Sequence, residues 1–178
     1  FAVVSFPALF PPMAGAVTLG FYAGSFDPPT LAEMAVVRCA FGDANVHKEC
    51  HDIGKTISRV VVAVNQAGDE DPLASTRERV LMVKKTLQKY GDRVEIVTGT
   101  GDSEEKALSL LGDKNVEQLI WFIDEDSYKV ARSAPVNQDP RLLWVVVSVK
   151  KQGASSPAID PKNLPPNVKL LSGVEQVK

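Results

Sequence analysis

The sequence predicts one doubly wound α/β domain built on a mainly parallel sheet of five to six strands. Its 178 residues suit a single domain, and a composition of 44% apolar and 24% charged residues is typical of a globular protein. Short β-branched runs alternate with segments of helical length, which is the pattern of a parallel sheet with crossover helices. We assign residues 17–178 to this domain and residues 1–16 to an apolar, extended arm.

Strands are expected where apolar, β-branched runs are bounded by glycine, proline or charged residues. SRVVVAV and LLWVVV are the clearest of these runs. The expected strands are Val17–Ala23, Ser58–Val64, Arg93–Thr98, Val116–Ile123, Arg141–Val149 and, as a sixth, Val168–Leu171.

Helices are expected between these strands, and Ser75–Tyr90 is the clearest because it is amphipathic. Ser75 and Glu78 predict a capping box at its start, and Gly91 predicts its end. Its apolar face is assigned to Val80, Leu81, Val83 and Leu87. The other expected helices are Thr30–Phe41, a helix capped by Asp102 and Glu105 that runs to Leu111, and Asp124–Ala131. Three segments are interpreted mostly as loop, namely Gly42–Lys55, Gln66–Leu73 and Lys150–Pro166.

The uncharged stretch from Phe1 to Phe26 is long enough to raise the question of a membrane span. Pro7, Pro11 and Pro12 break a helix there, so we expect an extended lead-in to a buried strand and no membrane span. The net charge of −2 argues against a surface built for nucleic acid or anionic lipid.

Two cysteines, Cys39 and Cys50, are too few for a disulfide framework and fit a reducing intracellular compartment. An organelle matrix, reached after loss of a targeting peptide, is the alternative location. Together with His47 and His51 the cysteines include zinc-binding residue types, but they lack the paired spacings of zinc modules. We therefore expect no metal site, and interpret the region as a buried thiol plus a polar surface loop.

The turn after the first expected strand carries the chemistry. In an open parallel sheet the ligand sits at the carboxyl ends of the strands, and here the first strand runs into Gly24 and Ser25. Phe-Asp-Pro-Pro then forces a tight turn, and a helix begins near Thr30. A helix start at this place offers free N–H groups and a partial positive charge, which predicts a phosphate-binding unit.

The segment GSFDPPTLAE resembles the first signature of adenylyltransferases and cytidylyltransferases, G-x-F-D-P-x-[TH]-x-G-H. ASTRERVLMVKKTL is similar to the helix after the second strand of that nucleotidylyltransferase superfamily. LIWFIDEDSYKV followed by LLWVVVSV resembles two later strands of nicotinate and nicotinamide mononucleotide adenylyltransferases. The resemblance covers roughly Val17 to Leu171 and implies a Rossmann-like fold.

The resemblance implies a reaction that joins ATP to a mononucleotide and releases pyrophosphate, with magnesium sharing the phosphate charge. Thr30 and Glu33 match the two phosphate-contacting signature positions and are the implied catalytic residues. The implied nucleotide-binding residues are Gly24, Ser25, Phe26, Asp27, Thr30 and Asp126. No cofactor follows from the residues themselves; ATP and magnesium are expected if the chain is active.

Glu33 departs from the signature, which has a histidine there. Thr30 and Glu33 lie one turn apart and face the same way. A carboxylate cannot donate to phosphate, and loss of one such donor commonly costs about a hundred- to a thousand-fold in rate. The same carboxylate suits the first turn of a helix, where it complements the helix dipole. Ala32 also replaces the signature glycine.

The second signature, I-S-S-T-x-I-R, has two alignments in this chain. Ala154–Asp160 keeps two serines and an isoleucine but has Asp160 where arginine belongs. Strand order favours the alternative, in which the signature follows Val168–Leu171 and the chain reads Ser-Gly-Val-Glu-Gln-Val-Lys. Both alignments lose the arginine.

Two further segments have functional and structural interpretations. Thr98–Ser103 follows a strand and opens a helix like a phosphate loop, but a turn with a helix cap is favoured. Asp124–Ser127 could bind magnesium, but acidic residues at a strand end are ordinarily caps.

We therefore expect a degenerate, catalytically inactive nucleotidylyltransferase-like protein. It would act as a scaffold or accessory subunit of a larger complex, with protein partners and a retained ability to bind ATP or a mononucleotide. The apolar arm would be a docking segment for a partner. The alternative is an active nicotinate or nicotinamide mononucleotide adenylyltransferase.

Overall fold

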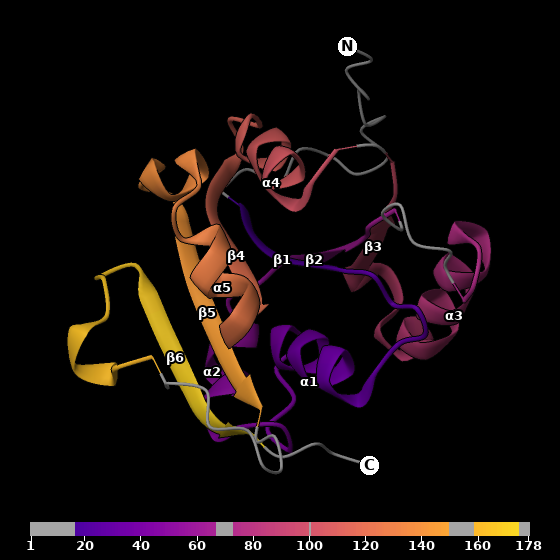
Figure 1. The fold of residues 1–178 in the computed structure, drawn as a ribbon, viewed down its shortest axis with the longest axis horizontal. Helices are drawn as coiled ribbons and strands as arrows, with labels where there is room; N and C mark the ends of the chain where they lie inside the picture. The colour runs from indigo at the N-terminus through magenta and orange to yellow at the C-terminus, as the bar shows by residue number, and fades with distance from the viewer. Residues whose placement is uncertain (1–16, 67–72, 100, 150–158, 175–178) are drawn as a thin grey trace.

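The computed structural model describes residues 17–66, 73–99, 101–149 and 159–174. Six parallel strands form one sheet in the order β3-β2-β1-β4-β5-β6 (Figure 1). This is the strand order of a doubly wound fold whose crevice lies between β1 and β4. The strands are β1 Val17–Gly24, β2 Arg59–Val64, β3 Val94–Val97, β4 Val116–Asp124, β5 Leu142–Val149 and β6 Val168–Val174. The expected fold class is confirmed, and the sheet has six strands where five to six were expected.

Helices cover both faces of the sheet (Figure 1). The α-helices are α1 Leu31–Ala40, α2 Lys48–Gly54, α3 Thr76–Leu87, α4 Ser103–Leu111 and α5 Glu125–Ala131. Short 3₁₀ turns occupy Gln88–Arg93, Pro135–Gln138 and Pro161–Asn163. Within these described segments, no helix is both long enough and apolar enough to cross a bilayer.

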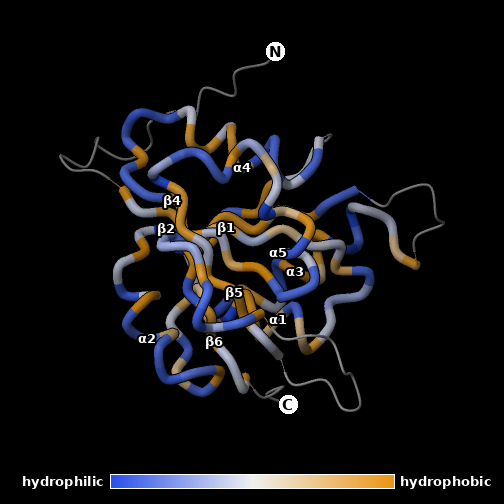
Figure 2. Tube along the Cα trace, turned by 60° about the vertical axis from the view of Figure 1, so that its left-hand side comes forward, coloured by the Kyte–Doolittle hydropathy of each residue, from blue (hydrophilic) through white to orange (hydrophobic). Residues whose placement is uncertain are grey.

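Alternation along the strands divides the core into two layers. In β2, Val60, Val62 and Val64 pack with α1, α2 and α3, whereas Val61 and Ala63 face α4 and α5. Both sets are fully buried, because a parallel sheet covered on both sides needs apolar residues at successive positions. Figure 2 shows the apolar colour following the central strands and the polar colour on the helices around them.

The expected capping signals are confirmed. The Ser75 hydroxyl accepts from the Glu78 N–H at 3.2 Å, and the Glu78 carboxylate accepts from the Ser75 N–H at 2.8 Å. Helix α3 ends earlier than expected, at Leu87, and Gly91 with φ of 56° lies in the following 3₁₀ turn. The assignment of Leu81 to the apolar face is wrong, since it is 56% exposed.

The interpretation of Gly42–Lys55 as mostly loop is also wrong, because Lys48–Gly54 forms α2. Two turns are too short to display a helical period in the sequence. The N-cap is His47, whose Nδ1 accepts from the Glu49 N–H at 3.2 Å, and histidine is not among the usual capping residues.

The two cysteines do not remain buried thiols: Cys39 of α1 and Cys50 of α2 form a disulfide. Both are fully buried. A side chain at Gly54 would collide with the backbone of Gly42, so this pair of glycines permits the close approach of the two helices. The sulfurs meet because of this packing, which the ten residues between the two cysteines do not reveal.

Several expectations fall partly or wholly outside the described residues. They include the apolar arm, residues 1–16, most of two expected loops, residues 67–72 and 150–158, and parts of both alignments of the second signature, residues 154–158 and 175–178. In the alternative alignment, Ser172 to Val174 continue β6 past the expected end at Leu171. In the described residues, neither alignment therefore supplies a helix start that could hold phosphate.

Candidate functional site

The turn between β1 and α1 lies at the carboxyl end of the central strand, as expected. Strand β1 ends at Gly24, whose carbonyl accepts from the Asn65 N–H at 2.9 Å, and Thr30 is the N-cap of α1. Phe26 has a positive φ of 51° and is fully buried, with its ring edge-on to Tyr22 at 5.7 Å. Burial of the Phe26 ring holds the turn in this uncommon backbone conformation, which aims its N–H groups toward α1.

Glu33 closes this turn from inside. One carboxylate oxygen accepts from the Phe26 N–H at 3.2 Å, and the other accepts from the Thr30 N–H at 3.0 Å and the Thr30 hydroxyl at 3.2 Å. The Thr30 hydroxyl in turn accepts from the Glu33 N–H at 3.1 Å, which completes a capping box. The donors that a phosphate would use are therefore bound to a carboxylate of the chain itself. We call this arrangement of Phe26, Thr30 and Glu33 the filled cradle.

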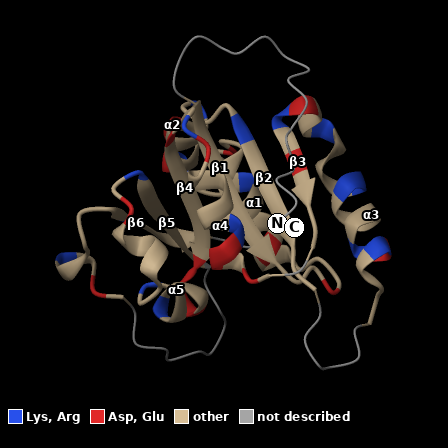
Figure 3. Ribbon diagram, turned by 90° about the horizontal axis from the view of Figure 1, so that it is seen from above, with Lys and Arg blue, Asp and Glu red and all other residues tan. Residues whose placement is uncertain are grey.

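Gly24 makes room for this carboxylate. A methyl group at Gly24 would stand 3.0 Å from a Glu33 oxygen and 3.0 Å from the Tyr22 ring. Burial, together with the charges of Glu33 and Asp124, raises the pKa of the Tyr22 hydroxyl far above its usual range, so the phenol stays neutral. Figure 3 shows acidic positions around the tips of the central strands.

Asp27 ties the turn to α3. Its two carboxylate oxygens accept from the N–H groups of Leu73 and Ala74, each at 2.8 Å. Those donors precede the N-cap of α3, so Asp27 fastens the start of one helix to the turn before another. Its role in nucleotide binding stays a prediction, as do the roles of Gly24, Ser25 and Phe26.

A buried cation, Arg79, lies behind the turn and was missed by sequence reasoning. Its guanidinium donates to the carbonyls of Ser25 and Asn65 and to the Thr76 hydroxyl, and the side chain is fully buried. Arg79 thereby joins the ends of β1 and β2 to α3. The sequence could have indicated that Arg79 is buried, because Arg79 precedes the buried Val83 and Leu87 at the helical spacing of four residues.

Lys106 brings a second cation to this edge of the sheet. Its ammonium donates to the Asn65 side-chain oxygen at 3.2 Å and to the Gly101 carbonyl at 3.1 Å. Burial lowers the pKa of Lys106, and the charges of Asp102 and Glu105 oppose that shift in part. Asp102 caps α4 by accepting from the Glu105 N–H at 2.9 Å, which confirms the helix cap expected at the end of the segment Thr98–Ser103.

The acidic run after β4 is occupied by structural contacts. Asp124 caps α5 by accepting from the Ser127 N–H and hydroxyl at 2.9 and 2.8 Å. Glu125 accepts from the Ser148 hydroxyl and the Ile159 N–H, each at 3.1 Å. Asp126 is exposed in the first turn of α5, and its role in nucleotide binding is untested.

The residues around the cradle do not assemble a magnesium site of their own. In the described ranges no three His, Cys, Asp or Glu side chains are grouped to hold a metal ion. The Glu33 and Asp124 carboxylates already accept hydrogen bonds from the backbone, and Asp160 caps a 3₁₀ turn by accepting from the Lys162 N–H at 2.9 Å. Binding of ATP with magnesium stays a prediction.

The six-stranded order and the turn before α1 define an α/β protein with the nucleotidylyltransferase fold. No family model matches the chain. Over 72 residues the chain is 35% identical to a phosphopantetheine adenylyltransferase of Desulforamulus reducens, a match that spans 40% of this chain and 37% of that protein. The resemblance to the nucleotidylyltransferase superfamily is thereby confirmed.

Two solved structures share the fold. Both are of Plasmodium falciparum nicotinic acid mononucleotide adenylyltransferase, one complexed with NaAD and one with APC. Their TM-scores to this chain are 0.52 and 0.55, at 13% and 12% identity. Each match covers 87% of this chain and 74% of the other. At this identity the likeness establishes the shared fold alone.

Proposed function

We propose that this chain is a degenerate nucleotidylyltransferase-like protein that does not transfer nucleotidyl groups and serves as a scaffold or accessory subunit. The observation that carries the proposal is the filled cradle, in which Glu33 accepts hydrogen bonds from Phe26 and Thr30. Fold similarity to adenylyltransferases supports descent from a nucleotide-binding ancestor.

The filled cradle disfavours phosphate in two ways. A phosphate must displace the carboxylate, which then loses its hydrogen bonds from Phe26 and Thr30, each contributing about 1–3 kcal/mol to a charged acceptor. Where the carboxylate stays, a phosphate charge about 4 Å away is disfavoured by roughly 4 kcal/mol at an effective dielectric constant of about 20. This repulsion alone corresponds to roughly a thousand-fold loss of affinity.

The alternative is an active nicotinate or nicotinamide mononucleotide adenylyltransferase. Retention of Thr30 as the helix cap, and of Lys106 at the neighbouring strand end, favours this alternative. In that case the cation would offset part of the Glu33 charge.

The discriminating experiment supplies ATP, magnesium and either mononucleotide and measures pyrophosphate release. The wild-type chain should show no turnover above background, because no donor at position 33 stabilises the transferring phosphate. The double variant Ala32→Gly, Glu33→His restores both signature residues, so it should bind ATP more tightly than the wild-type chain. The single variant Glu33→Gln removes only the charge of Glu33 and thereby separates the effect of that charge from the effect of the signature residues. Wild-type turnover of about 1 s⁻¹ or more would establish the alternative.

The scaffold role has its own test. The tagged chain, expressed at its natural level in its source cells, should co-purify with stoichiometric protein partners. A monomeric protein recovered alone would contradict the scaffold role, whatever the outcome of the pyrophosphate assay. The same cells, fractionated, test the expected reducing or organellar compartment, and the Cys39–Cys50 disulfide disfavours a reducing one.

A further inference from the structure

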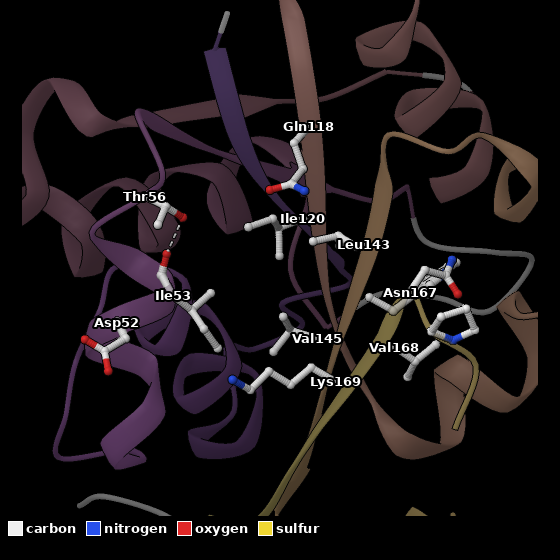
Figure 4. A pocket seen from close by; sticks show the side chains of 12 residues that line it. Asp52, Ile53, Thr56, Gln118, Ile120, Leu143, Val145, Asn167, Val168 and Lys169 are labelled. Atoms are coloured by element: carbon white, nitrogen blue, oxygen red, sulfur yellow. Dashed lines mark hydrogen bonds between the residues drawn. The ribbon is translucent and has the colours of Figure 1, made fainter. Parts of the chain in front are cut away.

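A hollow of about 370 Å³ opens on the sheet at the edge opposite the cradle (Figure 4). Its lining comes from α2 and from the beginnings of β4, β5 and β6, so it lies at the amino ends of the strands. Apolar side chains of one face of the sheet and of α2 form its walls, namely Ile53, Ile120, Leu143 and Val145. Figure 4 shows α2 and its Ile53 on one side of the hollow and Val168 on the other.

The charged groups at the rim of this hollow are already paired. The Lys55 ammonium binds Asp52 at 2.9 Å, and the Lys169 ammonium binds Glu49 at 3.4 Å. An occupant that brought a charge would have to compete with these pairs, whereas an uncharged one would leave them intact. The hollow therefore fits an uncharged, apolar occupant.

The chain itself carries such a segment, which joins the domain close to the hollow. Residues 1–16 contain no charged residue and include Phe1, Phe6, Leu9 and Phe10. They join β1 at Val17, whose N–H donates to the Asn115 carbonyl at 2.8 Å. The next residue, Thr18, lies opposite Gln118 in the β1–β4 register, and Gln118 lines the hollow.

The distances make this segment a suitable occupant. Adjacent strands lie about 4.8 Å apart, so the hollow extends across about 10 Å from β4 to β6. Sixteen extended residues can reach about 50 Å, which leaves ample length to turn back over the face. A tethered segment also has a high effective concentration at a site next to its own attachment point.

We propose that the apolar arm, residues 1–16, docks in this hollow and buries its large side chains against Ile53 and Leu143. The inference is independent of whether the cradle binds a nucleotide. It replaces the expected docking of the arm on a protein partner with docking on its own domain.

Site-specific photo-crosslinking on the full chain tests the proposal. The change Phe10→p-benzoylphenylalanine places the probe in the arm, and mass spectrometry identifies the linked peptides. The matched control carries the same probe at Leu73, which is 85% exposed and lies by the cradle at the other edge of the sheet. Mixing isotopically light and heavy chains separates links within a chain from links between chains.

Links within one chain from Phe10 to the α2 or β6 peptides, absent from the Leu73 control, are the expected result. The variant Leu143→Gln, once shown to be folded by circular dichroism, should reduce their yield severalfold. Links to other regions, links only between light and heavy chains, or a yield no higher than the control would each overturn the proposal.

Removal of residues 1–16 gives a second readout. The truncated chain should bind the dye ANS severalfold more strongly, because the apolar wall is then open to solvent. Its Tm should fall by about 4–10 °C, since a 178-residue domain loses apolar burial. A folded truncated chain with unchanged ANS binding and unchanged Tm would contradict docking. If the truncated chain does not fold, the crosslinking result decides.

Discussion

The carboxylate of Glu33 accepts a hydrogen bond from the backbone N–H of Phe26, seven residues earlier, at 3.2 Å. An ordinary capping box satisfies only the N-cap residue and the first turn of its helix. Here the same carboxylate also reaches back to the turn that precedes the cap. Glu33 thus stabilises the loop before α1 with hydrogen bonds from within the chain.

Replacing Glu33 with alanine should therefore have two opposite effects. The variant loses about 1–2 kcal/mol of unfolding free energy, because the Phe26 and Thr30 N–H groups lose their acceptor. It should gain affinity for pyrophosphate, which can take over the vacated donors. Urea denaturation and the rise of Tm with millimolar pyrophosphate measure the two effects. An equal Tm rise in the wild-type chain would show that the carboxylate does not block the cradle.

Arg79→Met should destabilise the domain by about 2–5 kcal/mol. The substitution removes a fully buried guanidinium and leaves the carbonyls of Ser25 and Asn65 without a donor. Arg79→Lys should rescue little, since an ammonium lacks the fork that reaches both carbonyls and Thr76. The exposed neighbour in the same helix provides the control, and Arg77→Met should change stability by less than about 0.5 kcal/mol. Equal effects at the two positions would refute this role of Arg79.

Loss of the disulfide should lower stability by about 3 kcal/mol. Cys39→Ser with Cys50→Ser opens a loop with a sequence separation of 11, for which the chain-entropy estimate is of that size. The measurement is urea denaturation of the double variant beside the non-reduced wild-type chain. Thiol titration of the unfolded wild-type chain without reductant should find no reactive thiol; two thiols would mean that the cysteines are not linked.

Acid should weaken the domain through Asp43. Burial raises the pKa of this carboxyl, but hydrogen bonds and charge from Arg38, with a hydrogen bond from Asn45, outweigh burial and leave the pKa below 3.8. Because the folded-state pKa is depressed, the stabilisation is present above the unfolded value of 3.8 and is lost as pH falls through the lower folded value. Asp43→Asn should therefore flatten the decline of Tm below about pH 4. A variant with the same acid profile as wild type would show that the ion pair contributes nothing.

Local patterns predicted most of the elements. Strand β2 is a run of β-branched residues that suits only a buried strand, and Ser75 with Glu78 marks a helix start whatever the rest of the fold does. The turn at Gly24–Thr30 was predictable because the two prolines restrict the backbone locally. Helix α2 escaped prediction because its seven residues carry no period and its cap is a histidine.

Part of the candidate site was likewise predictable from local sequence, and part of it was not. The sequence by itself determined the strand–turn–helix unit, the place of Thr30 at the helix start and the presence of a carboxylate where the signature has a donor. Only the tertiary structure decided that Glu33 reaches Phe26, that Arg79 lies behind the turn, and that Cys39 meets Cys50. Caps and strands depend on neighbours within a few residues, whereas these contacts depend on how whole elements pack.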